Sequence, residues 1–142
     1  MSLSRLVDTA LCLSRVHEYD PTHQTYMAAL IVKGGRTLSV GFNSRRSSGL
    51  QEHYKLNAHQ IGIHAEIDAI LSARRKIDLQ GSKIIVVRRL KNDTAENPAI
   101  GLAKPCVMCQ AVLYSYGIKR AHFTVSNTEV GSMKIVDPRN GT

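Results

Sequence analysis

The stretch IHAEIDAILSARR, residues 63–75, decides how the rest of the chain can be arranged. Its apolar residues recur at the spacing of one helical face, at positions Ile63, Ile67, Ile70 and Leu71. This spacing predicts a helix over residues 63–75 with one face in the core. A second stretch, PCVMCQAVLYSYG at residues 105–117, predicts a helix over 106–116, because proline favours helix starts and glycine favours helix ends.

Strands are predicted on both sides of these helices. They cover residues 26–33, 37–43, 83–90 and 121–125, with a short fifth over 132–136 and a Gly34-Gly35 turn joining the first two. An amphipathic helix opens the chain and ends before Asp20-Pro21, and long loops cover 44–62 and 91–104. The order αββαβαβ(β) predicts an α/β fold with helices packed on a mixed sheet and a right-handed crossover.

The composition is that of one soluble domain spanning residues 1–142. Hydrophobic residues make up 43% of the chain, and no apolar run approaches the length of a membrane span. The first residues lack the pattern of a signal peptide, so we expect a cytoplasmic protein without a membrane partner. Three cysteines cannot form a disulfide framework, and Cys12 is expected to be a small core residue on the apolar face of the first helix.

The formal net charge of +8 leaves two interpretations open. Such an excess favours phosphorylated or polyanionic partners, including nucleic acid, but a solvated basic surface has the same composition. The pairs Arg45-Arg46, Arg74-Arg75 and Arg88-Arg89 are expected to be solvated, with Arg45-Arg46 the best candidate for a phosphate contact.

The residues His64, Cys106 and Cys109 have the chemistry of a zinc site. Cys106 and Cys109 are three positions apart at a helix start, where the helix dipole stabilises thiolates. Three such ligands leave the fourth position of a catalytic zinc open. Glu66 lies about 200° around an ideal helix from His64, so both face one ion only if they lie in an irregular first turn.

With these residues identified, HAE followed by PCVMC resembles the signature of the cytidine and deoxycytidylate deaminase superfamily over roughly residues 27–125. The resemblance implies a three-layer α/β/α fold with a mixed, roughly five-stranded sheet. It also implies that His64, Cys106 and Cys109 hold Zn²⁺ and that Glu66 moves protons. The implied reaction is hydrolytic deamination of a cytosine base by zinc-activated water.

The resemblance also suggests substrate contacts. Asn43 corresponds to the substrate-binding asparagine of the family, and the backbone N–H of Ala65 is expected to contact the base. We expect Arg45 and Arg46 to hold a phosphate. Phe123 is a candidate for stacking on the base, as is Tyr54, although core or surface packing would also explain Phe123.

Two features depart from the common pattern of the family. Residues 91–104 form an insertion before the PCVMC motif, and Asp68 is interpreted as a solvated carboxylate near Arg75. At the position of His64 small cytidine deaminases generally use cysteine, so the chain more closely resembles deoxycytidylate deaminases, polynucleotide cytosine deaminases, tRNA adenosine deaminases and fungal cytosine deaminase. Within this set, the segment GIKRAHFTVSNTEVGSMKI, residues 117–135, resembles compact viral or microbial members of the deoxycytidylate-type branch. His53 and His59 could bind a second metal, but loop histidines are more often solvated.

Several functions remain open at this point. We expect deamination of dCMP to dUMP by a homo-oligomer. The alternatives are cytosine or adenine deamination within single-stranded DNA or RNA, and a structural zinc module in which His59 supplies a fourth ligand.

Overall fold

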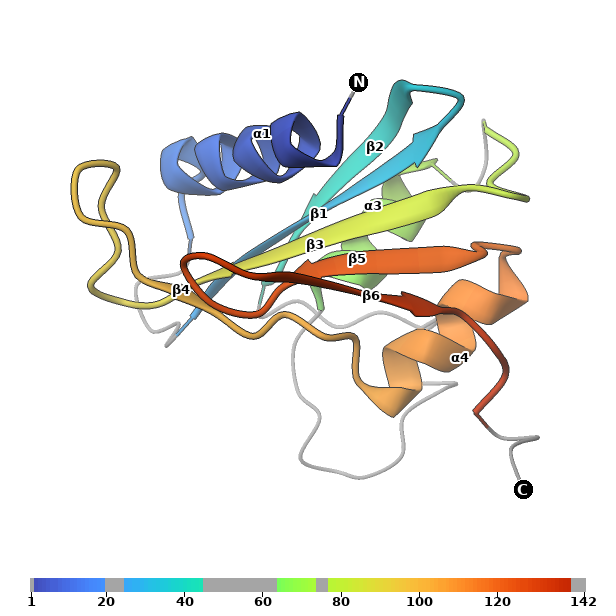
Figure 1. The fold of residues 1–142 in the computed structure, drawn as a ribbon. Helices are drawn as coiled ribbons and strands as arrows, with labels where there is room; N and C mark the ends of the chain where they lie inside the picture. Colours follow the sequence, from blue (N-terminus) through green and yellow to red (C-terminus); the bar gives the residue numbers. More distant parts are fainter. Residues whose placement is uncertain (1, 20–24, 45–63, 74–76, 139–142) are drawn as a thin grey trace.

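The computed structural model describes residues 2–19, 25–44, 64–73 and 77–138 (Figure 1). Its helices are α1 (Leu3–Val16), α3 (Ala65–Ala73) and α4 (Val107–Ser115). Its strands are β1 (Tyr26–Lys33), β2 (Arg36–Phe42), β3 (Lys83–Arg89), β4 (Ile100–Gly101), β5 (Arg120–Thr124) and β6 (Val130–Lys134). All the predicted elements are present, with ends within about two residues of the prediction, and β4 adds a short strand inside the 91–104 segment.

The strands form one mixed sheet in the order β2-β1-β3-β5-β6, with β4 paired to the end of β3. Strands β3 and β5 are parallel, and every other pair is antiparallel. Gly34 and Gly35 turn the β1–β2 hairpin with φ values of 58° and 78°, in the left-handed region that glycine adopts without steric cost. The predicted mixed sheet and glycine turn are therefore confirmed.

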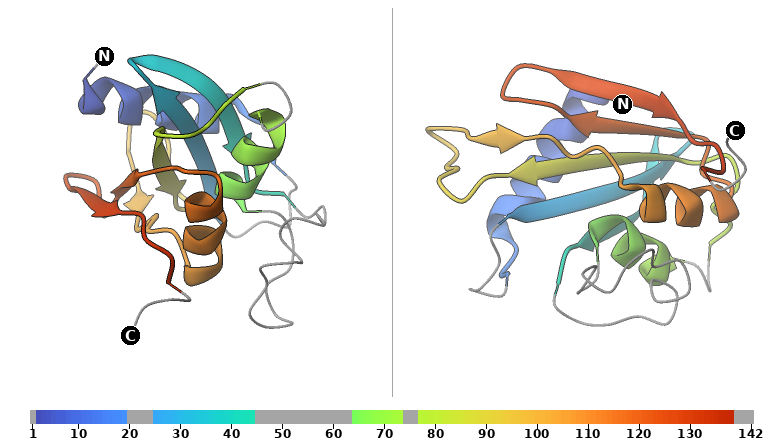
Figure 2. Two further views of the ribbon diagram at one scale, coloured as in Figure 1. Left: turned by 90° about the vertical axis from the view of Figure 1, so that its right-hand side faces the viewer. Right: turned by 90° about the horizontal axis from the view of Figure 1, so that it is seen from below.

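Helices cover both faces of the sheet, which gives the predicted three layers (Figure 2). Residues of β1 alternate between the layers: Ala29 and Ile31 pack toward α3 and α4, whereas Leu30 and Val32 pack toward α1. This alternation follows from the two-residue period of a strand. The strand is therefore apolar along most of its length because both of its faces are buried.

The first helix begins at Ser2, whose hydroxyl accepts a hydrogen bond from the N–H of Arg5 at 3.3 Å. The prediction for Cys12 was wrong, because its side chain is exposed. The helix buries its face at Leu6, Val7, Ala10 and Ser14. Cys12 is two positions from Ala10, about 200° around the helix, and so lies on the opposite side.

Within the described part of the chain, none of the helices has both the length and the apolar character that crossing a membrane requires.

Candidate active site

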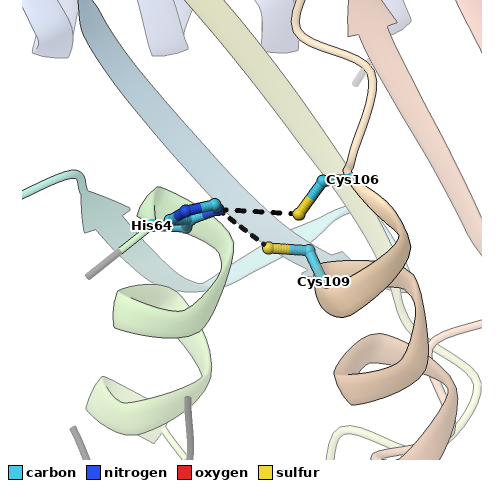
Figure 3. Close-up of side chains that lie close together, drawn as sticks. All are labelled: His64, Cys106 and Cys109. Carbon is cyan, nitrogen blue, oxygen red and sulfur yellow. Dashed lines mark hydrogen bonds between the residues drawn. The ribbon is translucent and has the colours of Figure 1, made fainter. Parts of the chain in front are cut away.

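Two helix starts meet at the candidate site (Figure 3). His64 precedes α3 directly, and its carbonyl accepts the first helical hydrogen bond, from the N–H of Asp68 at 3.0 Å. Cys106 is the extended N-cap residue of α4, and Cys109 lies in the first turn. The side chain of Gln110 donates to the carbonyl of Pro105 at 2.8 Å, which braces the turn that leads into α4.

The three predicted ligand side chains converge. Nδ1 of His64 lies 3.3 Å from Sγ of Cys109 and 3.8 Å from Sγ of Cys106. All three ligand atoms are within 4.8 Å of one another. Tetrahedral zinc with ordinary Zn–N and Zn–S bonds requires an N–S separation of about 3.6 Å, so the observed distances bracket the required value.

The electrostatics of the group favour a bound cation. The hydrogen bond from Cys109 and the interactions with His64 lower the pKa of Cys106 to about 4, although burial opposes this shift. The same bond to Cys106, together with burial, raises the pKa of Cys109. The hydrogen bond to Cys106 raises the pKa of His64 against the effect of burial. The group therefore already carries a thiolate at neutral pH, and a divalent cation would release the remaining protons.

Glu66 is buried beside this group, with 2% of its surface exposed. Burial raises the pKa of its carboxyl group, while the proximity of His64 lowers it. Oxygen Oε1 is buried and has no hydrogen-bond partner among the described residues. On an ideal helix the side chains of His64 and Glu66 would point about 200° apart. His64 precedes α3, so helical geometry does not fix its direction relative to Glu66.

The residues present fit Zn²⁺. One imidazole and two thiols are ligands that zinc prefers, and the described residues contribute three ligands, as in catalytic zinc sites. An unpaired carboxylate oxygen buried next to the group is costly for a purely structural site. That oxygen can accept a proton from a molecule held at the open position, which makes Glu66 a candidate general base.

Two other predicted substrate contacts, the side chain of Asn43 and the backbone N–H of Ala65, lie among the described residues. Oδ1 of Asn43 accepts from the N–H of Met27 at 2.8 Å, and Nδ2 donates to the carbonyl of Thr25 at 3.2 Å. These bonds fix the end of β2 to the start of β1. Ala65 is the first residue of α3 and is fully buried. Its N–H is one of those that have no partner within a helix.

Phe123 lies on β5 and is 7% exposed, in the same apolar cluster as Cys109. Its ring packs against Gly131 of β6, where an added Cβ would come within 2.7 Å of the ring. It is thus a core residue, and its contact with a base stays a prediction. Several other predicted positions, Arg45, Arg46, His53, Tyr54, His59 and Arg75, lie outside the described residues.

Two of the structural expectations are corrected near the site. Asp68 is not a solvated carboxylate: it is half-buried, and Oδ2 accepts from the N–H of Phe42 at 2.9 Å. Arg89 is not on a solvated face either. It is 8% exposed, and its guanidinium donates to Ser14 at 2.8–2.9 Å and contacts Asp93 at 3.3 Å. Both side chains have partners far along the chain, which adjacent residues do not indicate.

Sequence reasoning missed the contact that positions α3. The hydroxyl of Ser39 donates to the carbonyl of Ala69 at 2.6 Å. A Cβ placed on Gly41 would collide with backbone atoms of Ala65 and Ala69, so only glycine allows β2 to approach the helix this closely. The one signal in the sequence was the glycine itself inside a predicted strand, which marks either a bulge or a close backbone approach.

A His-Cys-Cys group at two helix starts, with a glutamate two residues after the histidine, is the arrangement of the zinc deaminases that act on nucleobases. A family model described as the cytidine and deoxycytidylate deaminase zinc-binding region matches residues 2–135. The chain belongs to this family, and the motif residues lie inside the matched region.

Solved structures have the same fold. The chain is similar to a cytidine deaminase from Burkholderia pseudomallei, with a TM-score of 0.66, 20% identity and coverage of 95% of this chain and 94% of that one. It is also similar to the dCMP deaminase from cyanophage S-TIM5 in complex with dCMP and dUMP, with a TM-score of 0.56, 20% identity and coverage of 87% and 82%. A comparison with curated proteins finds no match.

Proposed function

We propose that this protein deaminates a cytosine base hydrolytically, with dCMP as substrate and dUMP and ammonia as products. The observation that carries the proposal is the buried carboxylate of Glu66 beside the His64, Cys106 and Cys109 group, one oxygen of which has no hydrogen-bond partner among the described residues. Only a reaction that moves protons at this position gives such a costly group a function. Membership of the deaminase family supports the same reaction class.

The side chains divide the chemistry between them. His64, Cys106 and Cys109 would hold Zn²⁺, which when bound would make a water molecule acidic enough to attack at neutral pH. Glu66 accepts a proton from the water that adds to the amine-bearing carbon and donates it to the ring nitrogen of the base. It then carries the proton of the added hydroxyl group to the amino group, and the C–N bond breaks to release ammonia. Burial raises the pKa of the Glu66 carboxyl group toward the range in which it can both accept and donate.

The choice of dCMP rests on three arguments. His64 occupies the position where deoxycytidylate-type members of the family have histidine. The S-TIM5 enzyme, a protein of the same fold, is a dCMP deaminase. Finally, the basic residues Arg45 and Arg46 come two and three positions after Asn43 and can bind a 5′-phosphate by charge-assisted hydrogen bonds.

An assay of ammonia release from cytosine, cytidine, deoxycytidine, dCMP, dCTP, adenosine and a cytosine-containing single strand tests the proposal. We expect dCMP to have the highest kcat/KM. The double variant Arg45→Ala/Arg46→Ala should raise KM for dCMP and leave KM for deoxycytidine nearly unchanged, because the nucleoside has no phosphate. Faster turnover of the single strand than of dCMP would contradict the proposed substrate, and no turnover of any compound would favour the structural zinc module.

We also propose that the chain acts as a homo-oligomer in the cytoplasm. Light scattering coupled to size-exclusion chromatography tests the oligomeric state, and a single-chain mass at assay concentrations would contradict it.

A further inference from the structure

Cationic side chains from three neighbouring strands stand in register at one end of the sheet. Lys83 of β3 is the partner of Arg120 of β5, and Arg120 is the partner of Lys134 of β6. Paired residues of neighbouring strands project from the same face. That face is the α1 side, because Lys83 also pairs with Val32, which packs in the α1-side cluster.

Helix α1 leaves this part of the sheet open. It packs mainly on β1 and β3 and lies over that half of the sheet in Figure 1. Among the described residues, no helix covers the α1-side residues of β5 and β6. Lys83 and Lys134 are exposed, and Arg120 is half-buried.

These charges are not neutralised within the described part of the chain. None of the three side chains forms an ion pair with a described carboxylate, and Arg120 donates only to the hydroxyl of Ser132, at 3.3 Å. Like charges directly opposite each other on a sheet are destabilising. Burial and then the charges of Lys83 and Arg120 lower the pKa of His122, which lies two residues beyond Arg120 on the same face of β5. An anion bound along the row would remove this repulsion.

Two grooves meet at Lys119, beside the row. One, with a volume of about 280 Å³, is lined by Lys33, Lys83 and Lys119. The other, of about 390 Å³, is lined by Tyr114 and Ile118 together with Lys119. Tyr114 is 48% exposed. It belongs to α4, on the opposite face of the sheet from the cation row, and its groove meets the lysine-lined groove at Lys119.

This surface is remote from the candidate active site. The row lies at the first residues of the parallel strands β3 and β5. The N–H of Ala103 donates to the carbonyl of Thr124, the last residue of β5, at 2.8 Å. Cys106 is three residues after Ala103, and so it lies near this end of β5. The zinc ligands therefore lie toward the carboxyl ends of the strands. Cations at the amino ends are not placed to bind the phosphate of a nucleotide held at that centre.

We propose that the basic edge, formed by Lys83, Lys119, Arg120 and Lys134 with Tyr114, binds the phosphate backbone of single-stranded nucleic acid. Neighbouring strands are about 4.8 Å apart, so the cations form a line that suits a linear polyanion. Cations that contact the backbone and an exposed aromatic side chain on which a base can stack are the two features that single-strand binding uses. The proposal does not depend on which base the enzyme deaminates.

Fluorescence anisotropy with a labelled oligothymidylate of about 20 nucleotides tests the proposal, since this probe exceeds the usual site size and contains no amino group to remove. The variant Lys83→Gln/Lys134→Gln is compared with Arg5→Gln/Lys91→Gln, which removes the same charge at exposed positions outside the basic edge. The first variant should weaken binding about fivefold or more at low salt. It should also reduce the slope of log K against log salt by about 1.4, or about 0.7 for each lost contact. Equal weakening by both variants would overturn the proposal, as would no binding by the wild-type protein.

Two further measurements test whether another kind of ligand binds the basic edge and whether the strand binds at the active site instead. Tyr114→Ala should weaken binding about fivefold or more while leaving the salt slope unchanged, whereas Tyr114→Phe should bind as the wild type does. Polyglutamate is the competitor that tests for an acidic polypeptide. If it competed as well as unlabelled oligonucleotide and Tyr114→Ala had no effect, the edge would be assigned to an acidic polypeptide and the proposal would be overturned. Turnover of dCMP should be unchanged in Lys83→Gln/Lys134→Gln, and displacement of the oligonucleotide by saturating dCMP would place the strand at the active site instead.

Discussion

Single side chains account for the chemistry of the candidate site. The sulfur atoms of Cys106 and Cys109 and Nδ1 of His64 are positioned by two helix starts, within 4.8 Å of one another. Glu66 adds a buried carboxylate that has an unpaired oxygen. Burying the Glu66 carboxylate beside Cys106 and Cys109 costs desolvation energy. The proposed proton transfers give this buried group a function.

Replacing Glu66 with glutamine should abolish most activity while leaving the metal in place. The amide preserves the shape of the side chain but cannot accept a proton, and loss of a general acid/base costs on the order of 10²–10⁴-fold in rate. Turnover of the best substrate, zinc content and thermal unfolding should be measured on the same preparation. Near wild-type turnover by Glu66→Gln would refute the assigned role.

Removing a ligand should remove the metal. His64→Ala and Cys106→Ser should each lose most of the zinc measured by elemental analysis, and both should unfold at lower temperature because binding of the metal is coupled to folding. Cys12→Ser is the control, since the Cys12 thiol is exposed on α1. Its zinc content should match the wild type, and full zinc occupancy in His64→Ala would show that the ion is held elsewhere.

Helix α3 carries Glu66, and strand β2 fixes the position of this helix. The contacts are the hydrogen bond from Ser39 to Ala69, the bond from the N–H of Phe42 to Asp68, and the close approach at Gly41. These contacts link the strand that precedes Asn43 with the helix that follows His64. A shift of α3 would therefore move Glu66 relative to Cys106 and Cys109.

Gly41→Ala should impair activity through this packing. The added methyl group meets backbone atoms of Ala65 and Ala69, which cannot rotate away, and overpacking typically costs about 1–3 kcal/mol of unfolding free energy. Turnover should fall further than the loss of folded protein explains. Gly101→Ala is the matched control, because its closest neighbour is the flexible side-chain end of Leu90, at 2.9 Å. Equal activity in the two variants would argue against a positioning role for Gly41.

Across the whole molecule, a buried ionic network joins α1, β3 and the loop after β3. Asp93 accepts from Arg15 at 2.9 and 3.0 Å, from Arg89 at 3.3 Å, and from the N–H of Ala99 at 2.8 Å. Arg89 also lies over the ring of Tyr26, 4.9 Å from its centroid. The network fixes α1 over the sheet and orders the segment that leads to β4.

Asp93→Ala should lower the free energy of unfolding by about 3 kcal/mol, because it leaves the buried Arg89 without its carboxylate partner. Glu96→Ala, in the same loop but exposed, should change this free energy by less than about 0.5 kcal/mol. Chemical denaturation at neutral pH measures both changes. A change of similar size in the two variants would show that the network contributes little.

The same network predicts how stability depends on pH. Burial alone would raise the pKa of Asp93, but the bonds from Arg15, Ala99 and Arg89 outweigh it and lower this pKa. A lowered folded-state pKa gives stability that is fully present above the unfolded value of about 3.9 and is lost as the pH falls through the folded value. Asp93→Asn should therefore flatten the acid limb of the stability curve. An unchanged limb would mean that Asp93 does not contribute to acid unfolding.

The sequence alone determined all the elements except β4 and indicated the candidate metal ligands. Helix periodicity, the Pro105 and Gly117 boundaries and the Gly34-Gly35 turn act over a few residues, and so they can be recognised locally. The spacing of Cys106 and Cys109 placed both sulfurs on one side of a helix start, and the family resemblance supplied His64 and Glu66 as their partners. The structure confirms the convergence of the three ligands.

Only the tertiary structure decided which side chains lie inside and with which partners. Cys12 is exposed, because the packing of α1 buries the face that carries Ala10. Asp68 bonds to a strand 26 residues away, and Arg89 reaches Ser14, 75 residues earlier. The cations of the basic edge are scattered along the sequence and are aligned only by strand register. Contacts of this kind depend on the order and register of strands, which local patterns of residues do not encode.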